Sequence, residues 1–200
     1  DLSESRIALA RQEAEAQGLA DRIDARVEDA FAAAHESYDL VYWDHSLHHM
    51  MDVRHAVAWS VDRLRPGGLL LINEYLGPTR LQWTIAEVRR ARAFLAGAQA
   101  QLSAPIRSLW YRSPLSRLRM MMRDPSEAPQ SDRIMDACRA SCDGFAPTPI
   151  GCAMIDICSP HLVPATTEED AALYDLIAFD RQCAAEGFHH FAFGIWRKPG

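Results

Sequence analysis

The chain has 200 residues, 48% of them hydrophobic and 24% charged, and a formal net charge of −6 at pH 7. This composition excludes wholesale disorder, and the negative charge argues against a nucleic-acid partner. The longest aliphatic run, Leu69–Ile72, is far shorter than the ~20 residues of a membrane-spanning helix. The first residues do not read as a secretory leader, so we expect a cytoplasmic protein without a transmembrane segment.

The first part of the chain is expected to hold a strand end, a helix and a short strand. Asp1 reads as the end of a strand, because Ser3 follows it as a helix N-cap. The helix is expected to end near Gly18, a typical C-cap residue. Residues 22–27 alternate between polar and apolar side chains, which predicts a short strand ending near Asp29.

The next segments predict a strand, a helix and a strand. Residues 38–43 are apolar, β-branched or aromatic, which indicates a buried strand, and Asp52 is placed to cap the helix that follows. Residues 65–68 should end that helix, and residues 69–72 predict the next strand. This alternation with short connections favours parallel pairing, and such sheets bind ligands beyond the carboxyl ends of their strands. A site is therefore expected at Asp1, at Asp29, at residues 43–47 and at residues 73–75.

The second half contains a basic segment. Between Val88 and Arg123 lie eight arginines and no acidic residue, together with Trp110, Tyr111 and Met120–Met122. The simpler interpretation is a solvated helical face with an apolar underside. The alternative is a helical cap or insertion, residues 80–143, that attracts an anionic or amphipathic partner. A helix at 168–186 and a strand at 188–196 should complete the chain.

The cysteines and histidines are candidates for metal or thiol chemistry, but their spacing does not define a site. Cys138 and Cys142 are four residues apart, but no further ligands follow at zinc spacing, so buried free thiols are expected. Four histidines fall within residues 45–55, and His45 with His49, or His48 with His55, would share a helical face. No acidic partner is fixed by spacing, so we expect either a polar active-site rim or histidines satisfied by packing, and no metal. Asp44, His45 and Ser46 are the types of a hydrolytic triad, but sequence neighbours do not form one.

Three stretches then carry a family resemblance: residues 38–44, residues 47–49, and residues 64–68 with the apolar strand after them. They resemble the class I S-adenosylmethionine-dependent methyltransferases of the small-molecule type, and their order and spacing are more specific than any single motif. The other similar stretches are residues 1–3, 27–30, 73–78, 124–128 and 191–199. The resemblance implies a Rossmann-like α/β fold: a doubly wound, mostly parallel sheet in a single domain, residues 1–200, with a helical insertion between the fifth and sixth strands.

The resemblance also implies a cofactor, S-adenosyl-L-methionine, and methyl transfer to a small-molecule or lipid-like acceptor. Asp1 would accept from the ribose hydroxyls with Leu2 on the adenine, and Asp29 and the Ala30 amide would bind the adenine edge. The residues implied for the methyl-donor pocket are Trp43, Asp44 and His45. Glu74 and Tyr75 would face the acceptor, and an acceptor hydroxyl or amine would need a base, for which His45 and Glu74 are the candidates.

One departure from the family is clear. Its glycine-rich turn should precede Asp1, and no G-x-G occurs among the ten glycines. Because the chain starts without Met, we expect an amino-terminally truncated domain that does not bind S-adenosylmethionine detectably on its own. Two alternatives stay open: a nicotinamide-dependent oxidoreductase, in which Asp1 would also bind ribose, and a non-catalytic remnant that docks through the basic segment.

Overall fold

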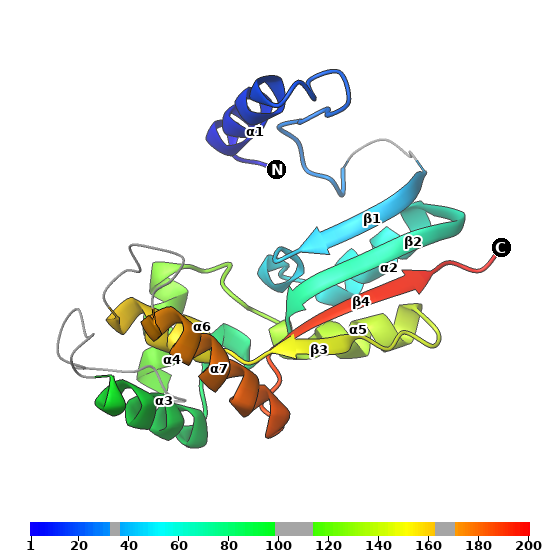
Figure 1. The fold of residues 1–200 in the computed structure, drawn as a ribbon. Helices are drawn as coiled ribbons and strands as arrows, with labels where there is room; N and C mark the ends of the chain where they lie inside the picture. The colour runs from blue at the N-terminus through cyan, green and yellow to red at the C-terminus, as the bar shows by residue number, and fades with distance from the viewer. Residues whose placement is uncertain (33–36, 99–113, 163–170) are drawn as a thin grey trace. The chain divides into compact units, whose positions relative to one another are not determined.

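The computed structural model describes residues 1–32, 37–98, 114–162 and 171–200 (Figure 1). The chain divides into two compact units, Asp1–Ser37 and Tyr38–Gly200, and each is described by itself. Within the described residues, no helix is long and apolar enough to cross a membrane.

The first unit contains the expected helix, α1 (Glu4–Ala16). The Ser3 side chain accepts a hydrogen bond from the Arg6 backbone N–H, and Gly18 takes a left-handed φ of 69° after the helix. The strand expected at residues 22–27 is wrong, because these residues are described and form no ladder. Its apolar members stay open, with Ile23 47% and Val27 43% exposed. An alternating pattern stabilises a strand only where a neighbouring strand pairs with its backbone and other elements bury its apolar face.

The second unit contains a sheet with the order β1-β2-β4-β3 (Figure 1). Its strands are β1 (Tyr38–Asp44), β2 (Leu64–Tyr75), β3 (Thr148–Gly151) and β4 (Phe191–Arg197). β1 and β2 are parallel, as expected, whereas β4 is antiparallel to both β2 and β3. The α/β class is confirmed, but the mostly parallel sheet is wrong for the described strands. The alternation in residues 188–196 predicts a strand and carries no information about its direction.

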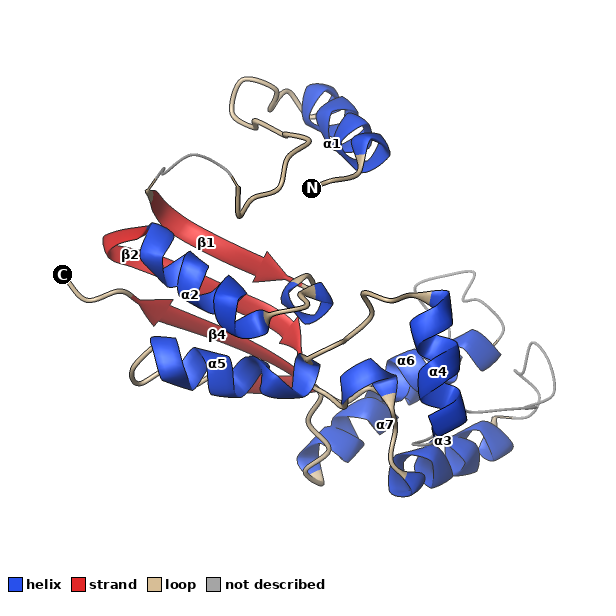
Figure 2. Ribbon diagram, turned by 180° about the vertical axis from the view of Figure 1, so that it is seen from behind, coloured by secondary structure: helices blue, strands red, loops and turns tan. Residues whose placement is uncertain are grey.

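Helices of this unit cover one face of the sheet, and others form a buried apolar cluster. The helices of the unit are α2 (Val53–Arg63), α3 (Ile85–Gly97), α4 (Pro114–Arg123), α5 (Ile134–Ser141), α6 (Met154–Cys158) and α7 (Ala171–Ala185). α2 and α5 cover the same face of the sheet, as Figure 2 shows. Residues of α3, α6 and α7 pack with Tyr75 and Trp83 in one buried cluster. Trp110 and Tyr111 of the basic segment lie outside the described residues.

Side-chain alternation along β1 and β2 positions the site. Leu70, Ile72 and Glu74 are buried on the face toward α2. Asp52 is the N-cap of α2, as expected. On the opposite face Leu40 and Tyr42 are each 49% exposed. The expectation of a fully buried strand at residues 38–43 is therefore wrong, because α2 and α5 cover only one face of the described sheet and the side chains on the other face of β1 stay open.

The cysteines are free and buried, as expected. Burial raises the pKa of Cys138 and of Cys158 to about 12. Both thiols therefore stay protonated near neutral pH, and protonated thiols are poor metal ligands.

A candidate active site at the ends of β1 and β2

Glu74 at the end of β2 is fully buried and hydrogen-bonded on both oxygens. Its Oε2 accepts from the backbone N–H groups of Ser46 at 2.8 Å and Leu47 at 2.6 Å. Its Oε1 accepts from the Tyr75 N–H at 2.8 Å and contacts His48 Nδ1. Glu74 therefore fixes the turn that follows β1, and its charge is compensated by donors at every contact.

His48 was not among the site residues expected from the sequence. It is buried, and its Nδ1 is held by Glu74, so the ring presents Nε2 to Glu127, whose Oε1 lies 3.8 Å away. A carboxylate behind one ring nitrogen fixes the tautomer and orientation of a histidine. His48 and Glu74 are 26 residues apart, so no local pattern announces their contact.

His45 follows β1 in a left-handed conformation, with φ of 45°. Its N–H donates to the Asn73 carbonyl at 2.9 Å, and its exposed ring lies 5.6 Å from that of Phe191. Such a backbone is uncommon outside glycine, although histidine tolerates it better than most residues, and it recurs at functional sites. His45 and Glu74 thus belong to the same end of the sheet, but only His45 is open.

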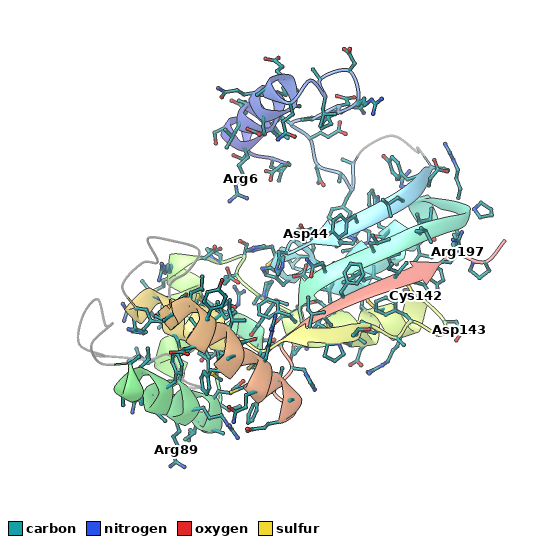
Figure 3. The ribbon with its side chains drawn as sticks, in the orientation of Figure 1. Arg6, Asp44, Arg89, Cys142, Asp143 and Arg197 are labelled. Atoms are coloured by element: carbon teal, nitrogen blue, oxygen red, sulfur yellow. The ribbon has the colours of Figure 1, made fainter. Side chains whose placement is uncertain are left out.

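Trp43 and Asp44 lie on opposite faces of β1. The Trp43 indole N–H donates to Ser60 Oγ on α2 at 2.8 Å, so its half-buried ring packs toward α2. Asp44 is exposed at the end of β1 (Figure 3), and its Oδ1 accepts from Asn73 Nδ2 at 2.7 Å. Of these two residues, Asp44 is the one that presents its polar group to solvent.

Tyr75 is buried rather than open to a ligand. Its hydroxyl donates to the Pro78 carbonyl at 3.1 Å, and its ring packs edge-on against Trp83. Burial raises the pKa of Tyr75 above its ordinary value, so the hydroxyl stays neutral.

A buried arginine, also missed in the sequence, anchors the loop that carries Glu127. Arg80 has φ of 59°, and its guanidinium donates to the carbonyls of Pro125 and, at 3.2 Å, Glu127. Its N–H donates to the Ala128 carbonyl at 2.8 Å. The Ser126 carbonyl in turn accepts from His49 Nδ1 at 3.1 Å. Residues 124–128, singled out by the resemblance, are thus tied to both histidines.

A cavity of about 800 Å³ opens beside this loop. Its lining is amphipathic, with Leu118 and Met121 next to Arg117 and Arg133. Both Arg117 and Arg89 belong to the basic segment. Arg117 lines the cavity, whereas Arg89 on α3 points outward into solvent (Figure 3). The segment thus supplies both a cavity wall and a solvated face.

A second carboxylate–histidine pair lies in the helical core. Glu87 Oε1 is 2.6 Å from His190 Nε2, and Cys152 Sγ lies 3.6 Å from His190 Nδ1. Burial raises the pKa of Cys152 to about 12, so this thiol is not a nucleophile near neutral pH. Glu87, His190 and Cys152 thus form a contiguous buried group with a neutral thiol.

In the first unit, the two predicted cofactor carboxylates sit at neighbouring positions. The terminal amino group of Asp1 donates to the Arg26 carbonyl at 3.3 Å, and the Asp1 carbonyl accepts from the Glu28 N–H at 3.2 Å. The carboxylates of Asp1 and Asp29 are exposed, and each accepts a local backbone N–H, from Ser3 and Phe31. Leu2 and Ala30 are exposed beside them. Exposed carboxylates of this kind can accept hydrogen bonds from hydroxyl and amino groups.

Residues 1–72 match the family model of a methyltransferase domain. The resemblance to methyltransferases is confirmed. The matched residues include the candidates from Asp1 to His45, whereas Glu74 and Tyr75 lie just beyond them. No curated protein matches the chain.

Several solved structures are similar over most of this chain. Geranyl diphosphate methyltransferase in complex with S-adenosylmethionine is 14% identical, with 98% of this chain and 66% of that chain covered and a TM-score of 0.44. The cyclase SpnF is 16% identical, with 99% and 64% covered and a TM-score of 0.48. Geranyl diphosphate C-methyltransferase from Streptomyces coelicolor A3(2) is 12% identical, with 98% and 61% covered and a TM-score of 0.44. The chain thus spans less than two thirds of the length of these proteins.

Proposed function

We propose that the protein transfers the methyl group of S-adenosylmethionine to a small-molecule or lipid-like acceptor. The observation that carries the proposal is the methyltransferase-domain match over residues 1–72. When bound, the cofactor supplies an electrophilic methyl group on a positively charged sulfur. The protein's task is then to bind the two reactants and hold them in line at near-attack distance.

Asp1, Leu2, Asp29 and Ala30 are assigned to the nucleoside part of the cofactor. The exposed carboxylates of Asp1 and Asp29 support this, because charge-assisted hydrogen bonds to hydroxyl and amino groups need open acceptors. Within the second unit we assign Asp44 to the positively charged end of the cofactor. Trp43 takes part by fixing β1 against α2, through its bond to Ser60.

His45 is assigned as the base for an acceptor proton, and Glu74 as a positioning residue. Both were candidates for the base, but the Glu74 oxygens already accept from Ser46, Leu47 and Tyr75. The His45 ring is exposed at the end of β1, where it can reach a substrate. Tyr75 acts on the acceptor side through Pro78, which lines the cavity beside it.

The acceptor is assigned to this amphipathic cavity. Arg117 and Arg133 suit an anionic group, and Leu118 and Met121 suit an apolar chain. The acceptor is therefore an anionic, amphipathic small molecule. The fold assigned to the whole protein is Rossmann-like and doubly wound, with residues 80–143 as a helical insertion that forms this cavity.

Calorimetric titration of the full-length protein with S-adenosylmethionine tests the proposal. Asp29→Ala should weaken binding about ten- to a hundredfold, because it removes a charge-assisted hydrogen bond worth about 1.5–3 kcal/mol. Asp21→Ala, at an exposed aspartate of the same unit, is the matched control and should bind normally. Binding of NAD instead would indicate an oxidoreductase, and binding of neither would indicate a non-catalytic remnant.

A further inference from the structure

Three potential metal ligands converge beside the candidate active site. His48, His49 and Glu127 each offer one ligand atom, and these atoms all lie within 4.8 Å of one another. The His48 and His49 ring centroids are 4.2 Å apart. Glu127 comes from the loop after α4, so two distant segments of the second unit meet here.

The environment of His48 is that of a supported ligand. Its Nδ1 is held by Glu74, which is itself fixed by the backbone N–H groups of Ser46 and Leu47. Ligating histidines almost always bond a carboxylate or carbonyl through the other ring nitrogen, which fixes the tautomer. His48 Nε2 is the nitrogen that remains, and it faces Glu127 Oε1 at 3.8 Å.

Hydrogen bonds also fix the His49 ring and the backbone that carries Glu127. The carbonyl of Ser126 accepts from His49 Nδ1 at 3.1 Å, and the buried Arg80 holds the carbonyls on either side of Ser126. Ligands around a tetrahedral zinc lie about 3.4 Å apart, given bonds of about 2.0–2.2 Å. His48 Nε2 and Glu127 Oε1, 3.8 Å apart, are already close to this spacing, and all the ligand atoms lie within 4.8 Å of one another.

We propose that His48, His49 and Glu127 bind a divalent transition metal, with zinc as the best match. Two imidazoles and one carboxylate are the ligands of open zinc sites, which keep a position for water or substrate, whereas magnesium prefers oxygen ligands. The open position takes an oxygen of an anionic small molecule. This proposal departs from the expectation of no metal and does not rest on methyl transfer. Glu127 is 78 residues beyond His49 in the sequence, so spacing gave no sign of it.

Titration of chelator-treated full-length protein with Zn²⁺ by calorimetry, and with Co²⁺ by visible absorption, tests the site. One equivalent should bind, with d–d bands of a four- or five-coordinate cobalt centre, and excess Mg²⁺ should not displace it. Glu127→Gln should weaken Zn²⁺ binding by at least about tenfold, since even residues behind the ligands change affinity ten- to a hundredfold. The matched controls, His189→Ala and Glu15→Gln, change exposed residues of the same types and should leave affinity unchanged.

His48→Ala should abolish the cobalt bands, but it also leaves Glu74 buried without this partner. Glu127→Gln leaves the contacts of Glu74 intact, so it keeps the test decisive if His48→Ala fails to fold by circular dichroism. Absence of one-to-one binding in the wild type overturns the site. Equal weakening in the controls and in Glu127→Gln also overturns it, and places the metal on other histidines or cysteines.

Discussion

Glu74 and Glu87 are both buried carboxylates that contact a histidine, yet the two pairs face different surroundings. Beyond His48 lies Glu127, half-buried at the ends of the strands, whereas beyond His190 lies the buried thiol of Cys152. The local chemistry is nearly the same in both. The two pairs differ in the group next to the second ring nitrogen, which is Glu127 for His48 and Cys152 for His190. The Glu74–His48 pair can therefore support a ligand site, whereas the Glu87–His190 pair supports the core.

The largest expected effect is the loss of stability in Glu74→Ala. The substitution leaves the N–H groups of Ser46 and Leu47, and the ring of His48, without their acceptor. Removing one partner from a buried ionic network costs about 3–5 kcal/mol. Urea unfolding followed by circular dichroism measures the change. A loss below 1 kcal/mol would mean that water replaces the carboxylate and that the turn does not depend on it.

Glu87→Gln should cost less, about 1–3 kcal/mol at neutral pH. Burial alone would raise the pKa of Glu87, but hydrogen bonds from His190 and Thr84 outweigh burial and lower it. A lowered pKa in the folded state stabilises the protein above the ordinary value of 4.5, and this stabilisation is lost as the pH falls through the folded-state pKa. The difference in unfolding free energy between wild type and Glu87→Gln should therefore shrink as the pH is lowered from about 6 to about 3. A difference that grows on acidification would contradict the assigned direction.

Asp44→Asn should change the affinity for the cofactor, whereas a substitution in the helical core should not. If Asp44 faces the positive sulfur, affinity for S-adenosylmethionine should fall about tenfold, a change of about 1.4 kcal/mol. Affinity for S-adenosylhomocysteine, which lacks that charge, should change much less. Calorimetry of both ligands gives the comparison, with Glu87→Gln as the core variant that should alter neither. Equal losses for the two ligands would remove Asp44 from the charged end.

The smallest expected effect concerns Cys152. Because burial raises the pKa of Cys152 to about 12, iodoacetamide should not label it in the folded protein near neutral pH. Mass spectrometry after labelling, with urea-unfolded protein as the positive control, measures this. Rapid labelling of the folded protein would show that Cys152 is reactive. The Glu87–His190 pair would then no longer differ from the Glu74–His48 pair in being purely structural.

Local sequence patterns predicted much of the fold, but they did not predict contacts between residues that are far apart in the sequence. Ser3 and Asp52 were recognised as helix caps because a cap bonds a backbone N–H only three residues away. The direction of β4 was missed because alternation is the same in both directions. In the candidate site, Glu74 and His45 stood out as strand ends. His48 gains its place only through Glu74, and the sequence separation of the two residues hides that contact.

The anchoring of the Glu127 loop by Arg80 also bears on how the protein folds. The two carbonyls that the guanidinium holds lie 45 and 47 residues further along the chain. Closing so long a loop has an entropic cost that only late, cooperative packing repays, and non-local contacts of this kind slow folding. The unit of β1, α2 and β2, residues 38–75, is joined by shorter-range contacts. We therefore expect this unit to form before the contacts of Arg80 with the Glu127 loop.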